Sequence, residues 1–392
     1  MTPFRVLVVD DSPFMRKIIT DLIVRNRDFA VVATAKTGSE AVEAARLWKP
    51  DVITMDLEMP EMNGLDALRR IMAIQPTPII MLAGISEDNT SETIKALQLG
   101  AFDFIRKPSG DGSTSIWKVA QQLQDKLKAA VSFKPKNNRL SDGLSQRRPV
   151  QQAAPPVAKP NRVKRDLPPV AAVPPNPLPP SDEEPTLAGN SRKQAVKPTS
   201  AIFDHVVAIG TSTGGPRALH EVISSLPAGY AAPVLVVQHM PPRFTRSLAE
   251  RLDSFSEVQV IEAEQGSRVK AGMVYIAPGG FHMELAKDRS GYYIHLHEAE
   301  PRHGHRPSVD TLFESLIHRN ELKRHAVLMT GMGSDGASGM KKLLDSGAAT
   351  AVAEAEETCV VYGMPRSAIE RGGVTAVLPL PQIAGHLTRI VN

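Results

Sequence analysis

The sequence predicts two α/β domains with mainly parallel sheets, joined by a segment that has no core of its own. Its 392 residues are too many for a single domain at roughly 150 residues per domain. Short apolar runs alternate with amphipathic stretches over residues 1–131 and again over residues 201–392, which is typical of a βα repeat. Residues 132–200 hold 14 of the 32 prolines and show no lasting apolar period. We therefore expect two domains with a linker between them.

The basic charge of the chain lies mainly in this linker. It carries twelve Lys and Arg against five Asp and Glu, a net charge of +7, whereas the whole chain carries +4. The two domains together are thus mildly acidic, which favours a solvated spacer over a nucleic-acid-binding face. We expect no nucleic-acid partner.

The sequence also indicates a compartment. No run of about 18 apolar residues is present. The segment before RVLVVDD has neither the basic region nor the long apolar region of a signal peptide. The single cysteine, Cys359, excludes an intramolecular disulfide and a cysteine-based zinc site. These features predict a cytoplasmic protein that does not insert into a membrane, and we expect a monomer.

The first domain has five apolar runs, RVLVV, AVVATA, DVITM, PIIML and FDFI. Charged side chains lie at the ends of three of them. Asp10 and Asp11 follow the first run, Asp56 ends the third, and Lys107 follows the fifth. In a doubly wound parallel sheet these strand ends meet at one edge, where ligands bind. Three carboxylates there repel one another and need a cation, and hard oxygen ligands suit Mg²⁺. The alternative for any single Asp is a helix N-cap.

These residues, together with MDLEMPEMNGLDAL and GAFDFIRKP, resemble the response-regulator receiver family over the whole first domain. The resemblance implies a flavodoxin-like sheet in which Asp56 accepts a phosphoryl group. It also implies that Asp10 and Asp11 hold Mg²⁺ together with the backbone carbonyl of Glu58. Lys107 would then contact the phosphoryl oxygens.

One position departs from the receiver pattern. Phe104 stands where the family has its switch aromatic, but Ala83 stands where receivers usually have Thr or Ser. The missing hydroxyl would normally reach the phosphoryl group. The resemblance therefore implies phosphorylation with weakened switch coupling, unless Ser86 or the backbone N–H of Gly84 supplies the contact.

The second domain contains a tight turn that could present a nucleophile. The runs VVAIG, APVLVVQ, MVYIAP, HAVLMTG and TAVLPL predict strands, and the insert YYIHLHE predicts an antiparallel edge or a lid. After the first of these, Ser212 lies in GTSTG and Pro216 suits the first turn of a following helix. This matches the G-x-S-x-G nucleophile elbow. A glycine-rich turn of this kind could equally cradle a phosphate.

A base and an acid at neighbouring strand ends favour the nucleophile. His239 follows the strand PVLVVQ, and Asp335 follows HAVLMTG. Asp335 alone could be a helix N-cap, but Ser212, His239 and Asp335 at one sheet edge predict a catalytic triad. The order Ser, His, Asp differs from the Ser, Asp, His order of α/β-hydrolases. Other histidines, such as His303 and His305 in RHGHR, are expected to be solvated or packed, since no Cys or paired acidic motif supports a metal site.

The second domain resembles the catalytic domain of the chemotaxis protein-glutamate methylesterase family, CheB. The resemblance rests on GTSTGGP, QHMPPRFT, YIAPGGFHM, HRPSVDTLF, LMTGMGSDGASGM and VYGMPRSAIE, in that order. It implies that Ser212, His239 and Asp335 are catalytic, that Thr213 flanks the nucleophile and that the backbone of Met332 is an oxyanion donor.

This second resemblance also implies partners. The substrates would be glutamate methyl esters on methylated chemoreceptors, and some family members deamidate receptor glutamines. A chemotaxis histidine kinase would be the phosphodonor, the receiver would cover the esterase cleft, and ester hydrolysis would need no cofactor. The linker, of about 69 residues, is longer than usual for the family.

Three other functions remain possible at this point. A transcription factor is disfavoured because the output domain has strands throughout and no short helix-turn-helix pattern. A non-enzymatic response-regulator scaffold would need no complete triad. A general serine esterase would need no receiver.

Overall fold

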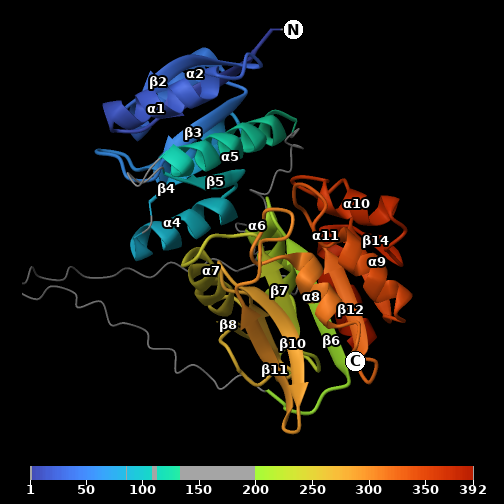
Figure 1. Ribbon diagram of the computed structural model, residues 1–392. Coiled ribbons are helices and arrows are strands. Elements are labelled where there is room, and N and C mark those ends of the chain that lie inside the picture. The colour runs from blue at the N-terminus through green and yellow to red at the C-terminus, as the bar shows by residue number, and fades with distance from the viewer. Residues whose placement is uncertain (1, 85, 108–112, 133–198, 392) are drawn as a thin grey trace, which may run out of the picture. The chain divides into compact units, whose positions relative to one another are not determined.

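The computed structural model describes residues 2–84, 86–107, 113–132 and 199–391 (Figure 1). The linker expected over residues 132–200 lies outside this part of the chain except at its two ends. At the second end, Ser200 and Ala271 exchange two backbone hydrogen bonds in an isolated antiparallel bridge. Ser200 is thereby attached to the second domain.

The first domain is built on one five-stranded parallel sheet. Its strands are β1 (Phe4–Val9), β2 (Phe29–Ala35), β3 (Val52–Asp56), β4 (Ile79–Ala83) and β5 (Asp103–Arg106). The spatial order is β2-β1-β3-β4-β5, and every neighbouring pair is parallel. This is the flavodoxin-like order, so the predicted doubly wound sheet is confirmed.

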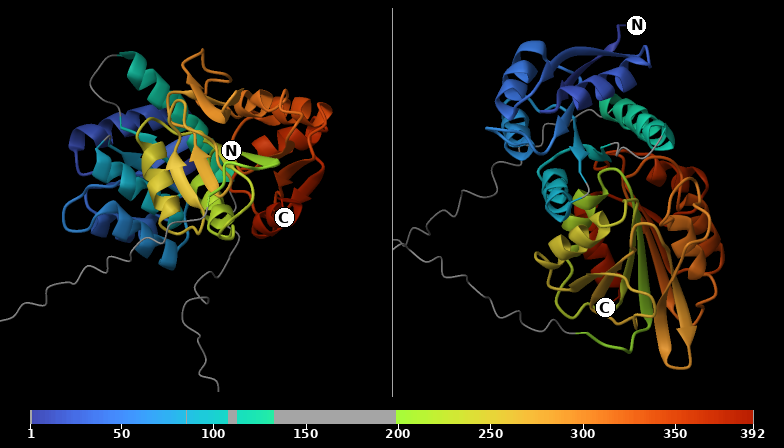
Figure 2. Two further views of the ribbon diagram at one scale, coloured as in Figure 1. Left: turned by 90° about the horizontal axis from the view of Figure 1, so that it is seen from below. Right: turned by 60° about the vertical axis from the view of Figure 1, so that its left-hand side comes forward.

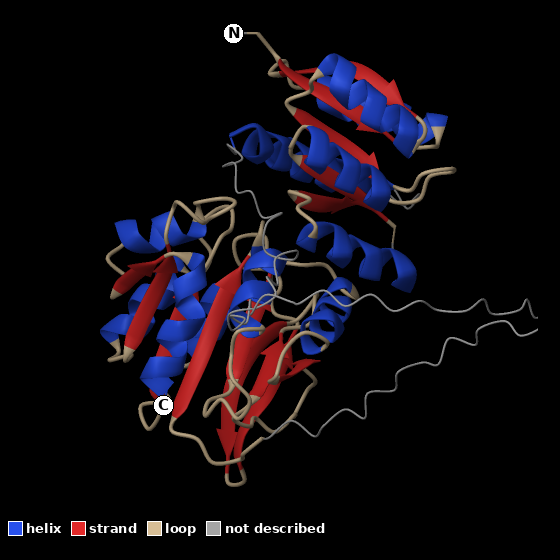
Figure 3. Cartoon of the chain, turned by 180° about the vertical axis from the view of Figure 1, so that it is seen from behind, coloured by secondary structure: helices blue, strands red, loops and turns tan. Residues whose placement is uncertain are grey.

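Helices cover both faces of this sheet (Figure 3). They are α1 (Pro13–Val24), α2 (Gly38–Trp48), α3 (Gly64–Ile74), α4 (Glu87–Gln98) and α5 (Ser113–Ser132). Helix α1 packs against α5, and α2 packs against α3. Ser12, Thr37 and Asn63 each cap a helix by accepting a backbone N–H three residues ahead. The central strands β3 and β4 are buried on both faces, which explains why they read as continuous apolar runs, whereas most residues of the edge strand β2 are only partly buried.

The second domain is built on a seven-stranded sheet. Its strands are β6 (His205–Thr211), β7 (Val234–Gln238), β8 (Gln259–Glu262), β9 (Met273–Ile276), β12 (Lys323–Leu328), β13 (Thr350–Glu354) and β14 (Ala376–Leu378). The order is β14-β13-β12-β6-β7-β9-β8, and all pairs are parallel. The mainly parallel sheet is confirmed. Strands β8 and β13 were not predicted, because QVIE is short and TAVAE is rich in alanine.

Alternating side chains on β6 point into two cores. Val207 and Ile209 pack on one face, and Val206 and Ala208 pack on the other. The first face is covered by α6 (Gly215–Ile223), α7 (Phe244–Asp253) and α11 (Leu380–Val391), and the second by α8 (Val309–Ser315), α9 (Ala337–Asp345) and α10 (Met364–Glu370). None of the helices in the described ranges is long and apolar enough to span a bilayer.

The insert forms a separate antiparallel pair, β10 (His282–Asp288) and β11 (Gly291–His297) (Figure 2). The strand expected at YYIHLHE is therefore present as β11. It does not extend the edge of the seven-stranded sheet, because β10 pairs only with β11 among the described strands. Helix α8 packs against β10.

A buried histidine in the second domain, His325, predicts a pH-dependent stability. His325 is 2% exposed, its Nε2 lies 2.9 Å from Nδ1 of His205, and its Nδ1 lies 2.9 Å from Oγ1 of Thr350. Burial, followed by repulsion from Lys323 and from the protonated forms of His205 and His386, lowers the pKa of His325 to about 4. The unfolded chain, whose histidines have pKa values near 6.5, therefore binds more protons between pH 6.5 and 4. The contribution of neutral His325 to the free energy of unfolding is therefore fully present above pH 6.5 and is lost as the pH falls toward 4.

We expect this loss to be roughly 2 to 4 kcal/mol for His325. Urea unfolding of the second domain at several pH values between 7.5 and 4.5 measures it. His325→Gln should make the dependence shallower, leaving the contribution of the other histidines whose pKa values are lowered, whereas His318→Gln, at an exposed histidine, should leave it unchanged. An equally steep dependence in His325→Gln would contradict this explanation.

Candidate phosphorylation site and active site

The charged residues of the first domain meet at the carboxyl edge of the five-stranded sheet. Nζ of Lys107 lies 2.6 Å from Oδ2 of Asp56 and 3.0 Å from Oδ2 of Asp10. Ligand oxygens of Asp10, Asp11 and Asp56 all lie within 4.8 Å of one another. Helix α1 is capped by Ser12 and not by an aspartate. The N-cap alternative for Asp10 and Asp11 is therefore wrong.

The electrostatics of this pocket favour a bound cation. Burial raises the pKa of Asp56 to about 6, and the nearby charges of Asp10 and Asp11 add to the rise although Lys107 opposes it. A buried carboxylate in this position is costly to ionise without a further positive charge. Three hard carboxylate oxygen donors fit Mg²⁺, so the residues present suit the ion that the receiver family uses.

The switch position carries no hydroxyl. Ala83 is fully buried at the end of β4, and its carbonyl accepts the backbone N–H of Lys107 at 2.9 Å. Ser86, one of the alternative donors, caps α4 by accepting the N–H of Asn89 at 3.2 Å. Phe104 is buried on β5, with the ammonium of Lys126 5.9 Å from its ring centroid.

The turn after β6 holds Ser212 in a fixed backbone geometry. Its N–H donates to the carbonyl of Thr330 at 3.0 Å, and its carbonyl accepts from the N–H of Gly215 and from Nε2 of Gln238. A Cβ on Gly215 would lie 2.8 Å from Cβ of Thr211 and 1.9 Å from Oε1 of Gln238, so glycine is favoured here. Gly214 has φ of +81°, which glycine adopts without strain. The expected sharp strand-to-helix turn is present.

His239 lies beside this turn at the end of β7. Its N–H donates to the carbonyl of Thr211 at 3.1 Å, and Nε2 of Gln238 bridges the carbonyls of Ser212 and His239. Nε2 of the His239 ring lies 2.7 Å from Oδ2 of Asp335. Nδ1 is buried and has no partner among the described residues. The structure thus joins the predicted base to the predicted acid.

Asp335 is held by the start of α8. Its Oδ1 accepts from Oγ of Ser308 at 2.8 Å and from the N–H of Asp310 at 3.1 Å, and its Oδ2 accepts from the N–H of Val309 at 2.7 Å. Helix α9, which follows Asp335 in the chain, has Gly336 at its N-cap. The alternative that Asp335 caps the next helix is therefore wrong. Ser308 and the start of α8 were missed, since nothing in the sequence links them to Asp335.

This environment fixes the proton on His239. Burial raises the pKa of Asp335, but its hydrogen bonds from His239, Val309 and Ser308 outweigh burial and hold the pKa well below its usual range. Ionised Asp335 can only accept, so Nε2 of His239 carries a proton and donates it. Nδ1 is then the nitrogen with a free lone pair.

The loop after β12 lies against the nucleophile turn. A Cβ on Gly331 would lie 2.8 Å from Cβ of Ser212, and the hydroxyl of Thr330 donates to the carbonyl of Thr213 at 2.8 Å. Met332 follows Gly331, is partly buried, and its N–H has no backbone acceptor among the described residues. Thr213 follows Ser212 directly in the chain, and the oxyanion role expected of the Met332 backbone stays a prediction.

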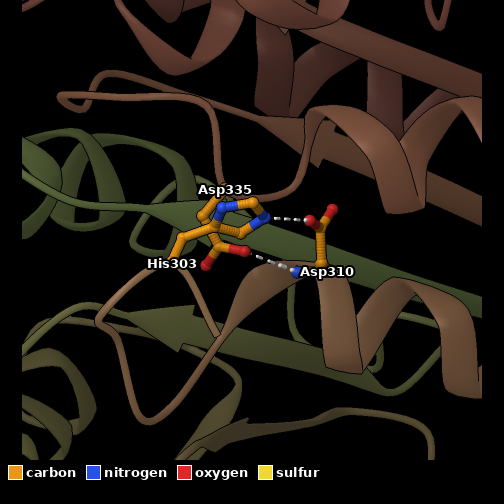
Figure 4. Close-up of side chains that lie close together, drawn as sticks. All are labelled: His303, Asp310 and Asp335. Carbon is orange, nitrogen blue, oxygen red and sulfur yellow. Dashed lines mark hydrogen bonds and ion pairs between the residues drawn. The ribbon is translucent and has the colours of Figure 1, made fainter. Parts of the chain in front are cut away.

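His303, Asp310 and Asp335 form a compact group (Figure 4). Nε2 of His303 lies 3.2 Å from Oδ2 of Asp310, and Oδ1 of Asp335 accepts the N–H of Asp310. The two oxygens of Asp335 already accept from four donors, so a metal ion would compete with all of them. We interpret the group as a hydrogen-bonded network.

His305 is not a solvated residue of the insert. Its ring is stacked on the ring of His239, with centroids 3.8 Å apart and planes inclined by 6°. The sequence left open whether His305 is solvated or packed, and the structure packs its ring against the proposed base. The only signal in the sequence was its place in HRPSVDTLF, one of the motifs behind the family resemblance.

Comparison with known proteins identifies both domains. Residues 207–387 match the family model of the CheB methylesterase, and residues 6–114 match the response regulator receiver domain. A protein-glutamate methylesterase/protein-glutamine glutaminase of Bacillus subtilis is 42% identical, covering 99% of this chain and 98% of its own length. A protein of the same name from Geobacillus kaustophilus is 42% identical over 100% of both chains. The crystal structure of the Thermotoga maritima CheB methylesterase catalytic domain is 46% identical, covering 48% of this chain and 100% of the solved chain, with a TM-score of 0.47.

Proposed function

Since this chain belongs to the receiver-containing CheB protein-glutamate methylesterase family, we propose that it hydrolyses glutamate methyl esters on methylated chemoreceptors. One observation carries the proposal: Nε2 of His239 donates to ionised Asp335 beside the sharp turn that holds Ser212. A non-enzymatic scaffold would not need this arrangement. A general serine esterase would not need the acidic receiver pocket.

The first half of the reaction forms an acyl-enzyme. Oγ of Ser212 attacks the ester carbonyl carbon while Nδ1 of His239 takes the hydroxyl proton. Asp335 keeps Nε2 protonated and stabilises the imidazolium. The N–H groups of Met332 and Thr213 are the proposed donors to the oxyanion. The C–O bond to the methoxy group then breaks, and the proton on His239 leaves with methanol.

The second half releases the product. Water attacks the acyl carbon, His239 takes one of its protons, and Ser212 leaves with that proton. The product is a free glutamate carboxylate. The same steps on a glutamine amide would release ammonia, so deamidation of receptor glutamines is part of the proposal. Neither reaction calls for a cofactor in the active site.

The receiver supplies the regulation. We propose that a chemotaxis histidine kinase donates a phosphoryl group to Asp56, with Lys107 contacting its oxygens. Mg²⁺, held by Asp10, Asp11 and Asp56 with the carbonyl of Glu58, would neutralise charge on the incoming phosphoryl group. We place the protein in the cytoplasm as a monomer, where its substrates are the cytoplasmic helices of the receptors.

A single assay tests this function. Receptor membranes carrying labelled methyl esters are incubated with the protein, with and without a small phosphodonor such as acetyl phosphate. Methanol release that the phosphodonor increases is expected. Release from simple esters but none from receptor membranes would point to a general esterase, and no release from either would point to a scaffold.

Removing the receiver is predicted to raise the basal rate. A truncated protein that starts near residue 200 should release methanol faster than the unphosphorylated full chain, because in this family the receiver covers the esterase cleft. A proline-rich tether of about 69 residues holds the domains at a local concentration of about millimolar without orienting them, so inhibition should be partial. Equal rates on the same membranes would exclude autoinhibition. Full-length Asp56→Asn should stay slow even with the phosphodonor.

Restoring the switch hydroxyl is predicted to strengthen activation. Ala83→Thr should raise the stimulation by the phosphodonor, because a hydrogen bond to a charged phosphoryl oxygen is worth roughly 1.5 to 3 kcal/mol, or about ten- to a hundredfold in a two-state equilibrium. Ala83→Val, of similar size without a hydroxyl, is the matched control. If the Thr variant is stimulated no more than wild type while Asp56 is phosphorylated equally, the hydroxyl does not limit coupling.

A further inference from the structure

A second imidazole lies on the face of the proposed catalytic base. The rings of His305 and His239 are nearly parallel, at 6°, and their centroids are 3.8 Å apart. This is closer than the 5.2 Å between the rings of His205 and His325. His239 is therefore fixed in two ways: Asp335 binds its edge and His305 covers its face.

The turn that carries His305 is itself anchored. Arg302 and His305 exchange two backbone hydrogen bonds, and the residues between them, His303 and Gly304, have φ of +51° and +79°. Positive φ at both central positions is the type I′ geometry of tight hairpins. The guanidinium of Arg302 binds both carboxylate oxygens of Glu314.

The same turn and Asp335 are both attached to α8. His303 lies 3.2 Å from Asp310 in the first turn of that helix, and Asp310 in turn donates its N–H to Asp335 (Figure 4). The contacts therefore close a ring that runs from α8 through Asp335 to His239, then through His305 and its turn back to α8. Movement of the His239 ring would have to break one of these contacts.

We propose that His305 is a positioning residue for His239, and that its stacked ring keeps Nδ1 of His239 directed at Ser212. The inference rests on the proposed function, because it concerns the same base. Burial and then His239 lower the pKa of His305 to about 4, so at neutral pH an uncharged ring lies on the imidazolium that forms during the reaction. A charged ring there would repel it.

Labelling of Ser212 by phenylmethanesulfonyl fluoride separates this role from a contact with the receptor. Oγ of Ser212 attacks sulfur, the S–F bond breaks, fluoride leaves and His239 takes the hydroxyl proton, so the rate depends on the base but not on receptor binding. The full chain is compared with His305→Gln, which keeps a polar side chain, and His305→Phe, which keeps a flat ring. His295→Ala, on β11 and outside the stack, is the control.

We expect His305→Gln to slow both labelling and methanol release about ten- to a hundredfold with an unchanged KM for receptor membranes, because small misplacements of a catalytic group cost this much. His305→Phe should recover most of both rates. Thermal unfolding and circular dichroism check that each variant is folded, and His305→Ala replaces any that is not.

Three outcomes would overturn the inference. If methanol release falls but labelling does not, His305 contacts the receptor substrate. If both variants react as fast as wild type, the stack does not position the base. If folded Gln and Phe variants are equally slow, a hydrogen bond of His305 matters and its ring does not. If the wild-type protein is labelled at Ser212 but releases no methanol, the proposed substrate is wrong. The comparison of labelling rates would still test the role of His305.

Discussion

Ser212→Ala should abolish methanol release from methylated receptor membranes while the protein stays folded. The hydroxyl is the proposed nucleophile, so its removal leaves only binding and oxyanion contacts, and a loss of about 10⁴-fold or more is expected. His239→Ala should cost about as much, because residues that act as one unit are not additive. The double variant should therefore be no slower than either single variant.

The control for this prediction is Ser225→Ala. Ser225 is an exposed serine just after α6 whose hydroxyl donates to the carbonyl of Glu221, and its loss should leave the rate unchanged. Initial rates of methanol release and the far-ultraviolet circular dichroism of each variant are measured together. Activity above about a hundredth of wild type in folded Ser212→Ala would contradict a covalent mechanism.

Asp335→Asn should lower the rate about 10³- to 10⁴-fold although the side chain keeps its size. Backbone N–H groups of Val309 and Asp310 each donate to a different oxygen of Asp335. An amide has only one oxygen, so its NH₂ group must face one of these donors whichever way it turns. With NH₂ toward His239, Nε2 becomes an acceptor and the proton moves to Nδ1, which removes the base.

The same substitution should also reduce stability, by roughly 1 to 3 kcal/mol for the donor left without an acceptor. Asp310→Asn is the matched control: this carboxylate is equally buried, accepts the N–H of Gly339, and does not touch His239. An amide oxygen at this position can still accept the N–H of Gly339, so this variant should cost less stability and keep the rate within about tenfold of wild type. Equal losses of rate in both variants would show that Asp335 acts only by holding α8.

Much of the fold follows from local sequence because buried parallel strands are continuous apolar runs. RVLVV and DVITM predicted β1 and β3, and HAVLMTG predicted β12, since few other local structures fit short apolar runs between helical patterns. Strand β13, TAVAE, escaped because alanine and glutamate have low β propensity and the sheet alone determines their conformation.

The residues of the candidate sites could be grouped from the sequence wherever they end predicted strands. Side chains that end parallel strands meet at one sheet edge by topology, so Asp10 and Asp56, and likewise Ser212 and His239, could be grouped from their positions in the chain. The sequence by itself determined which residue types meet, and therefore the chemistry that we propose for each domain.

Only the tertiary structure decided how these side chains are held. Asp335 depends on the start of α8, 25 to 27 residues earlier in the chain, and His305 stacks on His239 from a turn 66 residues away. No period or spacing encodes such contacts, because they arise from where α8 and the turn pack after both are formed. The ring nitrogen that acts as base follows from the same packing, since it is whichever one Asp335 leaves free.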